Sequence, residues 1–141
     1  MVALLGLTSN LVQSAPAEDQ FTNLPNITQE MGSASYSGYL NVSDSKQLHY
    51  VYIDSMDEPD FDPVVIWFNG GPGCSSLLGL FQENGPWVID DGETEIKANP
   101  YSWNRRANML YIESPAGVGF SRANIGKPEN DTSDFIQNDM T

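Results

Sequence analysis

The residues best suited to chemistry lie in a glycine-rich turn, Asn69 to Ser76, which directly follows the apolar run VVIWF at residues 64–68. Glycines let backbone N–H groups approach a ligand closely, because no Cβ atom intervenes. Leucine and phenylalanine at near-helical spacing over residues 77–81, then Asn84-Gly85-Pro86, predict a short helix that a serine of the turn can cap. A helix N-terminus adds positive potential, so the strand, turn and helix together predict an anion-binding device.

Three kinds of anion site use such a turn. A phosphate-binding P-loop requires a lysine after the glycines, and none follows Gly73. A dinucleotide site requires a third glycine at the position that Ser76 occupies. The third kind is the oxyanion-hole loop of an α/β-hydrolase, where a backbone N–H stabilises a tetrahedral oxyanion. Taken alone, the stretch is also compatible with a tight turn that needs glycine dihedrals and carries no chemistry.

The elements around the turn predict an α/β fold. Alternating residues over 35–42 and 46–55 predict an antiparallel hairpin at the leading edge of a sheet. The runs 64–68 and 108–114 are expected to be central strands, the first buried on both faces because its apolar residues do not alternate with polar ones. These strands are too few for a finished sheet, so we expect one edge and one face to be uncovered and the isolated chain to aggregate.

Two smaller features complete this organisation. Two short strands are predicted on either side of a turn at Asp91-Gly92. Phe135, Ile136 and Met140 have helical spacing at the end of the chain, and no stop signal follows them.

Four motifs in the same order resemble the serine carboxypeptidases, which are secreted or lysosomal/vacuolar α/β-hydrolases that remove C-terminal residues from peptides. The motifs are Asn69–Ser76 after Trp67, Glu83-x-Gly85-Pro86, the run at 99–104 (NPYSWN) and the run at 113–121 (ESPAGVGFS). The resemblance extends from about Tyr36 to Ser121. It implies that the chain is the N-terminal part of an α/β-hydrolase fold.

The resemblance also implies roles for single residues. The backbone N–H of Gly71, next to Gly70, would bind the oxyanion, while the amide of Asn69 would donate to the C-terminal carboxylate of a peptide substrate. Glu83 and Trp67 would belong to the same carboxylate-recognising network. Glu83 would then have to share a proton with the substrate, which favours activity at acidic pH.

Other implications concern the rest of the chain. Cys74, the single cysteine, would form a disulfide with a cysteine much further along in the family. The run at 113–121 is interpreted as a pocket wall and packing turn, and Trp103 as a residue that packs its loop. No cofactor and no metal are expected.

The catalytic triad is missing from the 141 residues. No Gly-x-Ser-x-Gly elbow occurs, and in the family the nucleophile, and after it Asp and His, would lie beyond Thr141. His49 precedes any such nucleophile and is interpreted as structural. We therefore expect the chain to be inactive alone and to need the remainder of the catalytic domain as its partner. The alternatives are a carboxypeptidase-like acyltransferase and a non-catalytic short form that acts as a binding module.

Composition and the N-terminus indicate the compartment. The net charge is −13, with only six Lys and Arg residues, which argues against nucleic-acid binding. Residues 1–17, with an apolar run and Ala15-Pro16-Ala17, are predicted to be a signal peptide preceding a domain at 18–141. Glycosylation sequons begin at Asn26, Asn41 and Asn130, and no run is long enough to span a membrane. We expect a glycoprotein of the secretory pathway, either lysosomal/vacuolar or extracellular.

Overall fold

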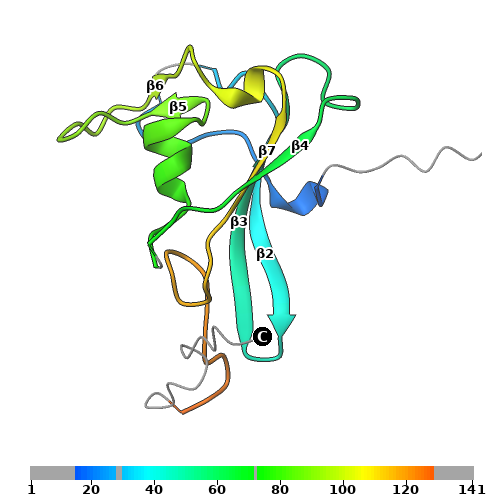
Figure 1. Cartoon of the computed structure of the whole chain (residues 1–141), viewed down its shortest axis with the longest axis vertical. Helices are drawn as coiled ribbons and strands as arrows, with labels where there is room; N and C mark the ends of the chain where they lie inside the picture. Colours follow the sequence, from blue (N-terminus) through cyan, green and yellow to red (C-terminus); the bar gives the residue numbers. More distant parts are fainter. Residues whose placement is uncertain (1–14, 28–29, 72, 129–141) are drawn as a thin grey trace, which may run out of the picture.

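The computed structural model describes residues 15–27, 30–71 and 73–128, which form a five-stranded mixed sheet in the order β1-β2-β3-β7-β4 (Figure 1). Its strands are β1 (Gln20–Phe21), β2 (Ser35–Ser43), β3 (Lys46–Ile53), β7 (Asn108–Ile112) and β4 (Val64–Trp67). A second, two-stranded sheet pairs β5 (Trp87–Val88) with β6 (Lys97–Ala98). The short helices are η1 (Ala17–Asp19), η2 (Gly79–Glu83) and η3 (Trp103–Arg105).

The predicted hairpin is confirmed. Strands β2 and β3 pair antiparallel, with Ser35 opposite Ile53, and the register shifts between Asn41 and Ser43. The sequence does not predict β1, because two residues are too few to show a period. This strand pairs with β2, so the hairpin is flanked on its outer side.

Strand β7 lies inside the sheet, antiparallel to β3 and parallel to β4. Parallel neighbours need a long crossover, and residues 68–107 between β4 and β7 supply it with η2, β5, β6 and η3. The predicted α/β class is thereby confirmed. The predicted short strands around Asp91-Gly92 are β5 and β6.

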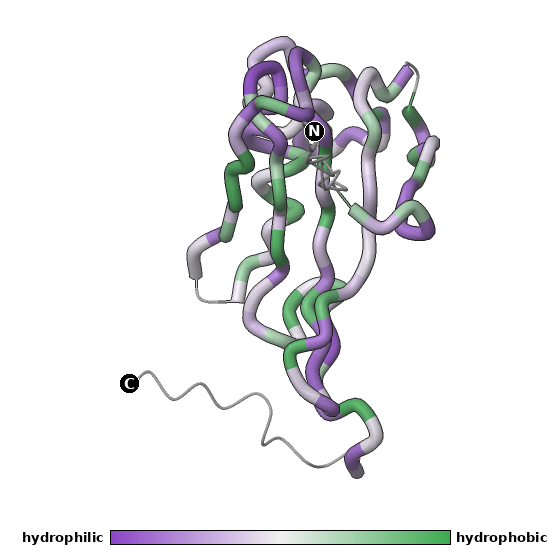
Figure 2. Tube along the Cα trace, turned by 90° about the vertical axis from the view of Figure 1, so that its right-hand side faces the viewer, coloured by the Kyte–Doolittle hydropathy of each residue, from purple (hydrophilic) through white to green (hydrophobic). Residues whose placement is uncertain are grey.

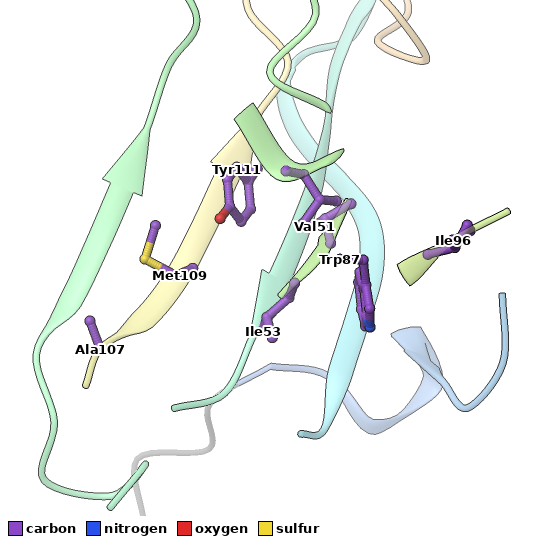
Figure 3. Packing of buried hydrophobic residues seen from close by; sticks show 8 residues of the cluster. Val51, Ile53, Trp87, Ile96, Ala107, Met109 and Tyr111 are labelled. Atoms are coloured by element: carbon purple, nitrogen blue, oxygen red, sulfur yellow. The ribbon is translucent and has the colours of Figure 1, made fainter. Parts of the chain in front are cut away.

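The core lies on the face of the sheet that η2 and β5 cover (Figure 3). In the ladder between β3 and β7, Val51 stands opposite Tyr111 and Ile53 opposite Met109, so the two strands bury matching side chains. Trp87 of β5 packs against this layer. A smaller cluster, centred on Tyr50, Tyr52 and Ile112, covers the opposite face.

The prediction that the run 64–68 is buried on both faces is wrong. Val64, Ile66 and Phe68 are 57%, 53% and 56% exposed. Their alternation places them on one face of β4, while Val65 and Trp67 pack against the core. Strand β4 is the outer strand of the described sheet, whereas β7 has a neighbour on each side and is buried at four of its five residues.

The predicted helix begins and ends close to its expected limits. The Ser75 Oγ accepts the N–H of Leu77, and the chain then forms one turn of π-helix in η2, closed by the N–H of Asn84 on the carbonyl of Gly79. The predicted C-terminal helix lies outside the described residues. In the part of the chain that the structure describes, no helix has the length and apolar character of a membrane span.

Hydropathy follows this architecture. The loops at the upper end of the molecule are largely hydrophilic, and hydrophobic residues recur along the strands below them (Figure 2). The glycine turn connects β4 to η2, at the carboxyl end of β4 (Figure 1).

Candidate active site

The glycine turn presents exposed backbone. Gly71 has φ +138°, in the region that favours glycine, and is exposed to solvent. A Cβ on Gly71 would lie 2.9 Å from the backbone nitrogen of Gly73 and 3.1 Å from that of Cys74. Any larger residue would therefore strain the turn. Gly70 is exposed beside it, so both predicted oxyanion-hole residues lie on an open surface.

Asn69 has its side-chain orientation fixed by hydrogen bonds. Its Oδ1 accepts the indole N–H of Trp67 at 2.7 Å and the backbone N–H of Gly79 at 3.1 Å. An amide oxygen accepts two such bonds, so the Nδ2 group must face the other way. Nδ2 lies 3.3 Å from Oε1 of Glu83, and its second N–H bonds to none of the residues that the structure describes.

The structure thus brings together the residues that the sequence predicts for carboxylate recognition. The indole of Trp67 bonds to Asn69, and Asn69 bonds to the exposed carboxylate of Glu83. Trp103 packs edge-on against Trp67, with ring centroids 5.6 Å apart, which confirms its predicted packing role. A Cβ on Gly79 would overlap the Trp67 indole, so this glycine lets η2 approach the ring.

A buried tyrosine lies beneath Glu83. Tyr111 of β7 is fully buried and donates its hydroxyl to Oδ1 of Asn84 at 3.0 Å. Burial, together with the nearby charge of Glu83, raises the pKa of the Tyr111 phenol above its ordinary value. Tyr111 therefore remains a protonated donor that holds the residue next to Glu83.

Two serines tie the turn to the end of β7, a role that the sequence alone does not predict for them. Ser76 Oγ accepts the N–H of Asn69 and donates to the carbonyl of Ile112 at 2.6 Å. Ser75 Oγ donates to the carboxylate of Glu113, which is fully buried. A glutamate directly after an apolar strand is the one sequence signal that could have pointed to this anchor.

The motif at 113–121 has the predicted packing role. Ser121 Oγ accepts the N–H of His49 and donates to the carbonyl of Glu113, which ties the motif to β3. Phe120 N–H donates to the Glu113 carboxylate at 2.8 Å. The second predicted role of the motif, as a wall of the substrate pocket, stays a prediction.

His49 is buried between Ser37 and Glu113. Its Nε2 lies 2.9 Å from Ser37 Oγ and its Nδ1 lies 2.9 Å from Glu113 Oε2. This is the connectivity of a serine–histidine–acid triad, but Ser37 lies within the ladder of β2 opposite Val51. The carboxylate of Asp19 also occupies the space next to Gly38, where it would repel an oxyanion. The environment of His49 therefore suits a structural role.

The remaining predicted residues are Cys74 and the asparagines of the three sequons. Cys74 lies within the glycine turn as an exposed free thiol, and the chain has no second cysteine to pair with it. Asn26 and Asn41 are exposed, whereas Asn130 and the first fourteen residues of the predicted signal peptide lie outside the described residues. Within the described ranges, no three His, Cys, Asp or Glu side chains gather as metal ligands would.

Comparison with known proteins decides the family. A family model described as serine carboxypeptidase matches residues 25–140. The chain belongs to the serine carboxypeptidase family. It is 51% identical to the mouse lysosomal protective protein over 109 residues, 77% of this chain and 23% of that protein. It is 48% identical over 123 residues to the serine carboxypeptidase ctsa-3.1 of Caenorhabditis elegans, 85% of this chain and 21% of that protein.

A solved structure supports the same assignment. The prohormone-processing carboxypeptidase Kex1(Δ)p of Saccharomyces cerevisiae superposes with a TM-score of 0.58 and 26% sequence identity, over 73% of this chain and 25% of that one. This serine carboxypeptidase family chain therefore shares the fold of one part of that enzyme. It spans about a quarter of the length of the relatives it matches.

Proposed function

We propose that these residues form the oxyanion-stabilising and carboxylate-recognising part of a serine-type carboxypeptidase. That enzyme would release C-terminal residues from peptides and proteins, and its catalytic Ser, Asp and His would come from residues outside these 141. The observation that carries the proposal is the fixed amide of Asn69, whose Oδ1 is held by Trp67 and Gly79 so that its Nδ2 group faces Glu83.

Asn69 and Glu83 suit the terminal carboxylate of a peptide. The Nδ2 of Asn69 donates to it without adding a charge to the site. Glu83 next to that carboxylate requires a shared proton, because two adjacent carboxylates are costly to ionise together. Substrate binding is therefore coupled to proton uptake and is favoured at acidic pH.

Gly71 suits the oxyanion of the tetrahedral intermediate. A backbone N–H on a fixed turn is already oriented where negative charge develops, so no reorganisation is needed during the reaction. The turn has no room for a side chain here, because a Cβ on Gly71 would lie 2.9 Å from the nitrogen of Gly73 and 3.1 Å from that of Cys74. Gly70 gives the substrate carbonyl room to approach.

The same proposal predicts how these residues contact the rest of the enzyme and in which compartment the enzyme works. The remainder of the catalytic domain would pack beside β4, where Val64, Ile66 and Phe68 are exposed, and a cysteine in it would pair with Cys74. Residues 1–17 would direct the chain to the secretory pathway, with glycans at Asn26, Asn41 and Asn130 and a lysosomal, vacuolar or extracellular destination. The name of the mouse relative supports the lysosomal option.

The test compares the native chain that carries these residues, produced from its complete transcript, with an Asn69→Ala variant. We expect release of C-terminal residues from peptides with a free carboxylate, no action on the same peptides with a C-terminal amide, and a KM raised about tenfold in the variant, because one charged-group hydrogen bond is lost. Cleavage of amidated and free peptides at equal rates would overturn the proposal. Transfer of an acyl group to an alcohol would instead support the acyltransferase, and a native protein near 15.5 kDa without activity would support the binding module.

A further inference from the structure

Glu113 is a buried carboxylate that lies at the end of β7, and the proposed chemistry does not use it. It is 0% exposed. Three donors converge on its two oxygens: Ser75 Oγ, the Nδ1 of His49 at 2.9 Å and the backbone N–H of Phe120 at 2.8 Å. Both oxygens of the buried carboxyl group therefore have hydrogen-bond partners inside the protein.

The partner His49 is held as firmly as Glu113. Its other nitrogen bonds to Ser37, and the rings of Tyr39 and Phe120 lie edge-on to it at 5.5 and 5.3 Å. The imidazole is therefore held in one orientation, with Nδ1 facing the carboxyl group of Glu113. Removing either partner would leave a buried polar group without a hydrogen bond, which is costly.

Gly119 leaves the space that the Glu113 side chain occupies. A Cβ at Gly119, which has φ +55°, would overlap the side-chain oxygens of Glu113. Gly119 therefore lets the packing turn close over Glu113 without displacing it.

Ser75 carries the effect of Glu113 to the glycine turn. The same Oγ that donates to Glu113 accepts the N–H of Leu77 at 3.1 Å, at the start of the helical segment. Ser75 is thus fixed on one side by the residue after β7 and on the other by the helix. It directly follows Cys74, whose backbone nitrogen would lie 3.1 Å from a Cβ on Gly71. The contact is one of two serine anchors of the turn, beside that of Ser76 to Ile112.

We propose that Glu113 is a positioning residue that holds Ser75, and thereby sets the direction of the Gly71 N–H for the oxyanion. The catalytic consequence rests on the proposed carboxypeptidase function, while the structural step does not. Glu113→Leu keeps a side chain of similar size but has no hydrogen-bonding atom, whereas a glutamine could still donate its NH2 group to Ser75 Oγ. In Glu113→Leu the contact to Ser75 is lost.

The test measures amide hydrogen exchange and kinetics in the native chain from its complete transcript. In Glu113→Leu we expect exchange of the Leu77 amide to rise at least tenfold, while that of the Asn69 amide, which bonds to Ser76 and so to Ile112, stays within threefold. For peptide hydrolysis we expect kcat to fall on the order of 10- to 100-fold with KM within threefold, because oxyanion binding acts in the transition state. Glu113→Asp should restore part of kcat.

A double-mutant cycle with Ser75→Ala separates positioning from general stability. If Glu113 acts through Ser75, the Leu77 amide exchange rate and the kcat of the double variant differ from wild type by no more than those of either single variant. Ser37→Ala, which removes the other partner of His49, is the matched control and should leave kcat within threefold. Additive effects, an unchanged Leu77 amide or faster exchange across the whole sheet would overturn the inference. An inactive wild-type chain in which Leu77 still responds would instead contradict the proposed function alone.

Discussion

The indole N–H of Trp67, the last residue of β4, donates to Oδ1 of Asn69 at 2.7 Å, two residues further along in the glycine turn. The bond turns the Asn69 amide so that its N–H groups face Glu83. A hydrophobic residue at position 67 would complete the core equally well, so this donor serves the orientation of Asn69.

Trp67→Phe should therefore weaken substrate binding in the native chain. The variant keeps an aromatic ring and loses one hydrogen bond, so KM for a peptide with a free C-terminus is expected to rise about tenfold with kcat within threefold. Trp103→Phe is the matched control, because it alters the ring packed on Trp67 and leaves the bond to Asn69 in place. Equal KM values for wild type and Trp67→Phe would show that Asn69 needs no such support.

Asn108→Ala should destabilise the fold. The buried Asn108 accepts the N–H of Ser55 and donates to the carbonyls of Pro59 and Asp62, each at 2.9 Å, so it holds the acidic loop before β4. Loss of three bonds to backbone groups is expected to lower the free energy of unfolding by about 3 kcal/mol in urea denaturation. The exposed Asn23→Ala should change it by less than about 0.5 kcal/mol. Equal changes in the free energy of unfolding for the two variants would show that Asn108 does not hold the loop before β4.

Alkaline pH should unfold the chain through its buried tyrosines. Burial, reinforced by Asp54, raises the pKa of Tyr52 to about 12, and burial raises the pKa values of Tyr50 and Tyr111 as well. In the unfolded chain these phenols ionise near pH 10, so the folded state binds more protons above that pH. The stabilisation that the protonated phenols contribute is fully present below about pH 10. It is lost as the pH rises towards about 12.

Thermal unfolding between about pH 8 and 12 measures this loss. Tyr111→Phe should make Tm fall less steeply with pH, whereas Phe at the exposed Tyr101 should leave the slope unchanged. A Tm that is constant up to pH 12 would contradict the linkage.

Ile66→Lys should reduce self-association. Ile66 is 53% exposed between Val64 and Phe68 on the outer strand β4, which offers both apolar side chains and an open strand edge. A lysine there is expected to raise the monomer fraction in sedimentation without changing Tm by more than a few degrees. Val65→Lys is the matched contrast, because Val65 packs against the core and its substitution should unfold the chain. A monomeric wild type at high concentration would remove the basis for this prediction.

The sequence by itself determined the features that depend on local pattern. Period-two alternation predicts the β2–β3 hairpin, because a strand with one face more buried than the other carries apolar residues at every second position. The glycines of the turn predict the exposed backbone at Gly71, because the conformation there excludes a Cβ. The order of the four motifs was enough to indicate the family.

Only the tertiary structure decided which partners those residues have. The apolar run at 64–68 has the sequence pattern of a central strand. The burial of a strand depends on the strands that flank it, and in the described sheet β4 is flanked by β7 alone. Glu113 and His49 are 64 positions apart, and no local pattern predicts that β3 and β7 place them 2.9 Å from each other. Hydrogen bonds between distant segments depend on how the sheet is assembled, which explains why the anchor of the glycine turn appears only in three dimensions.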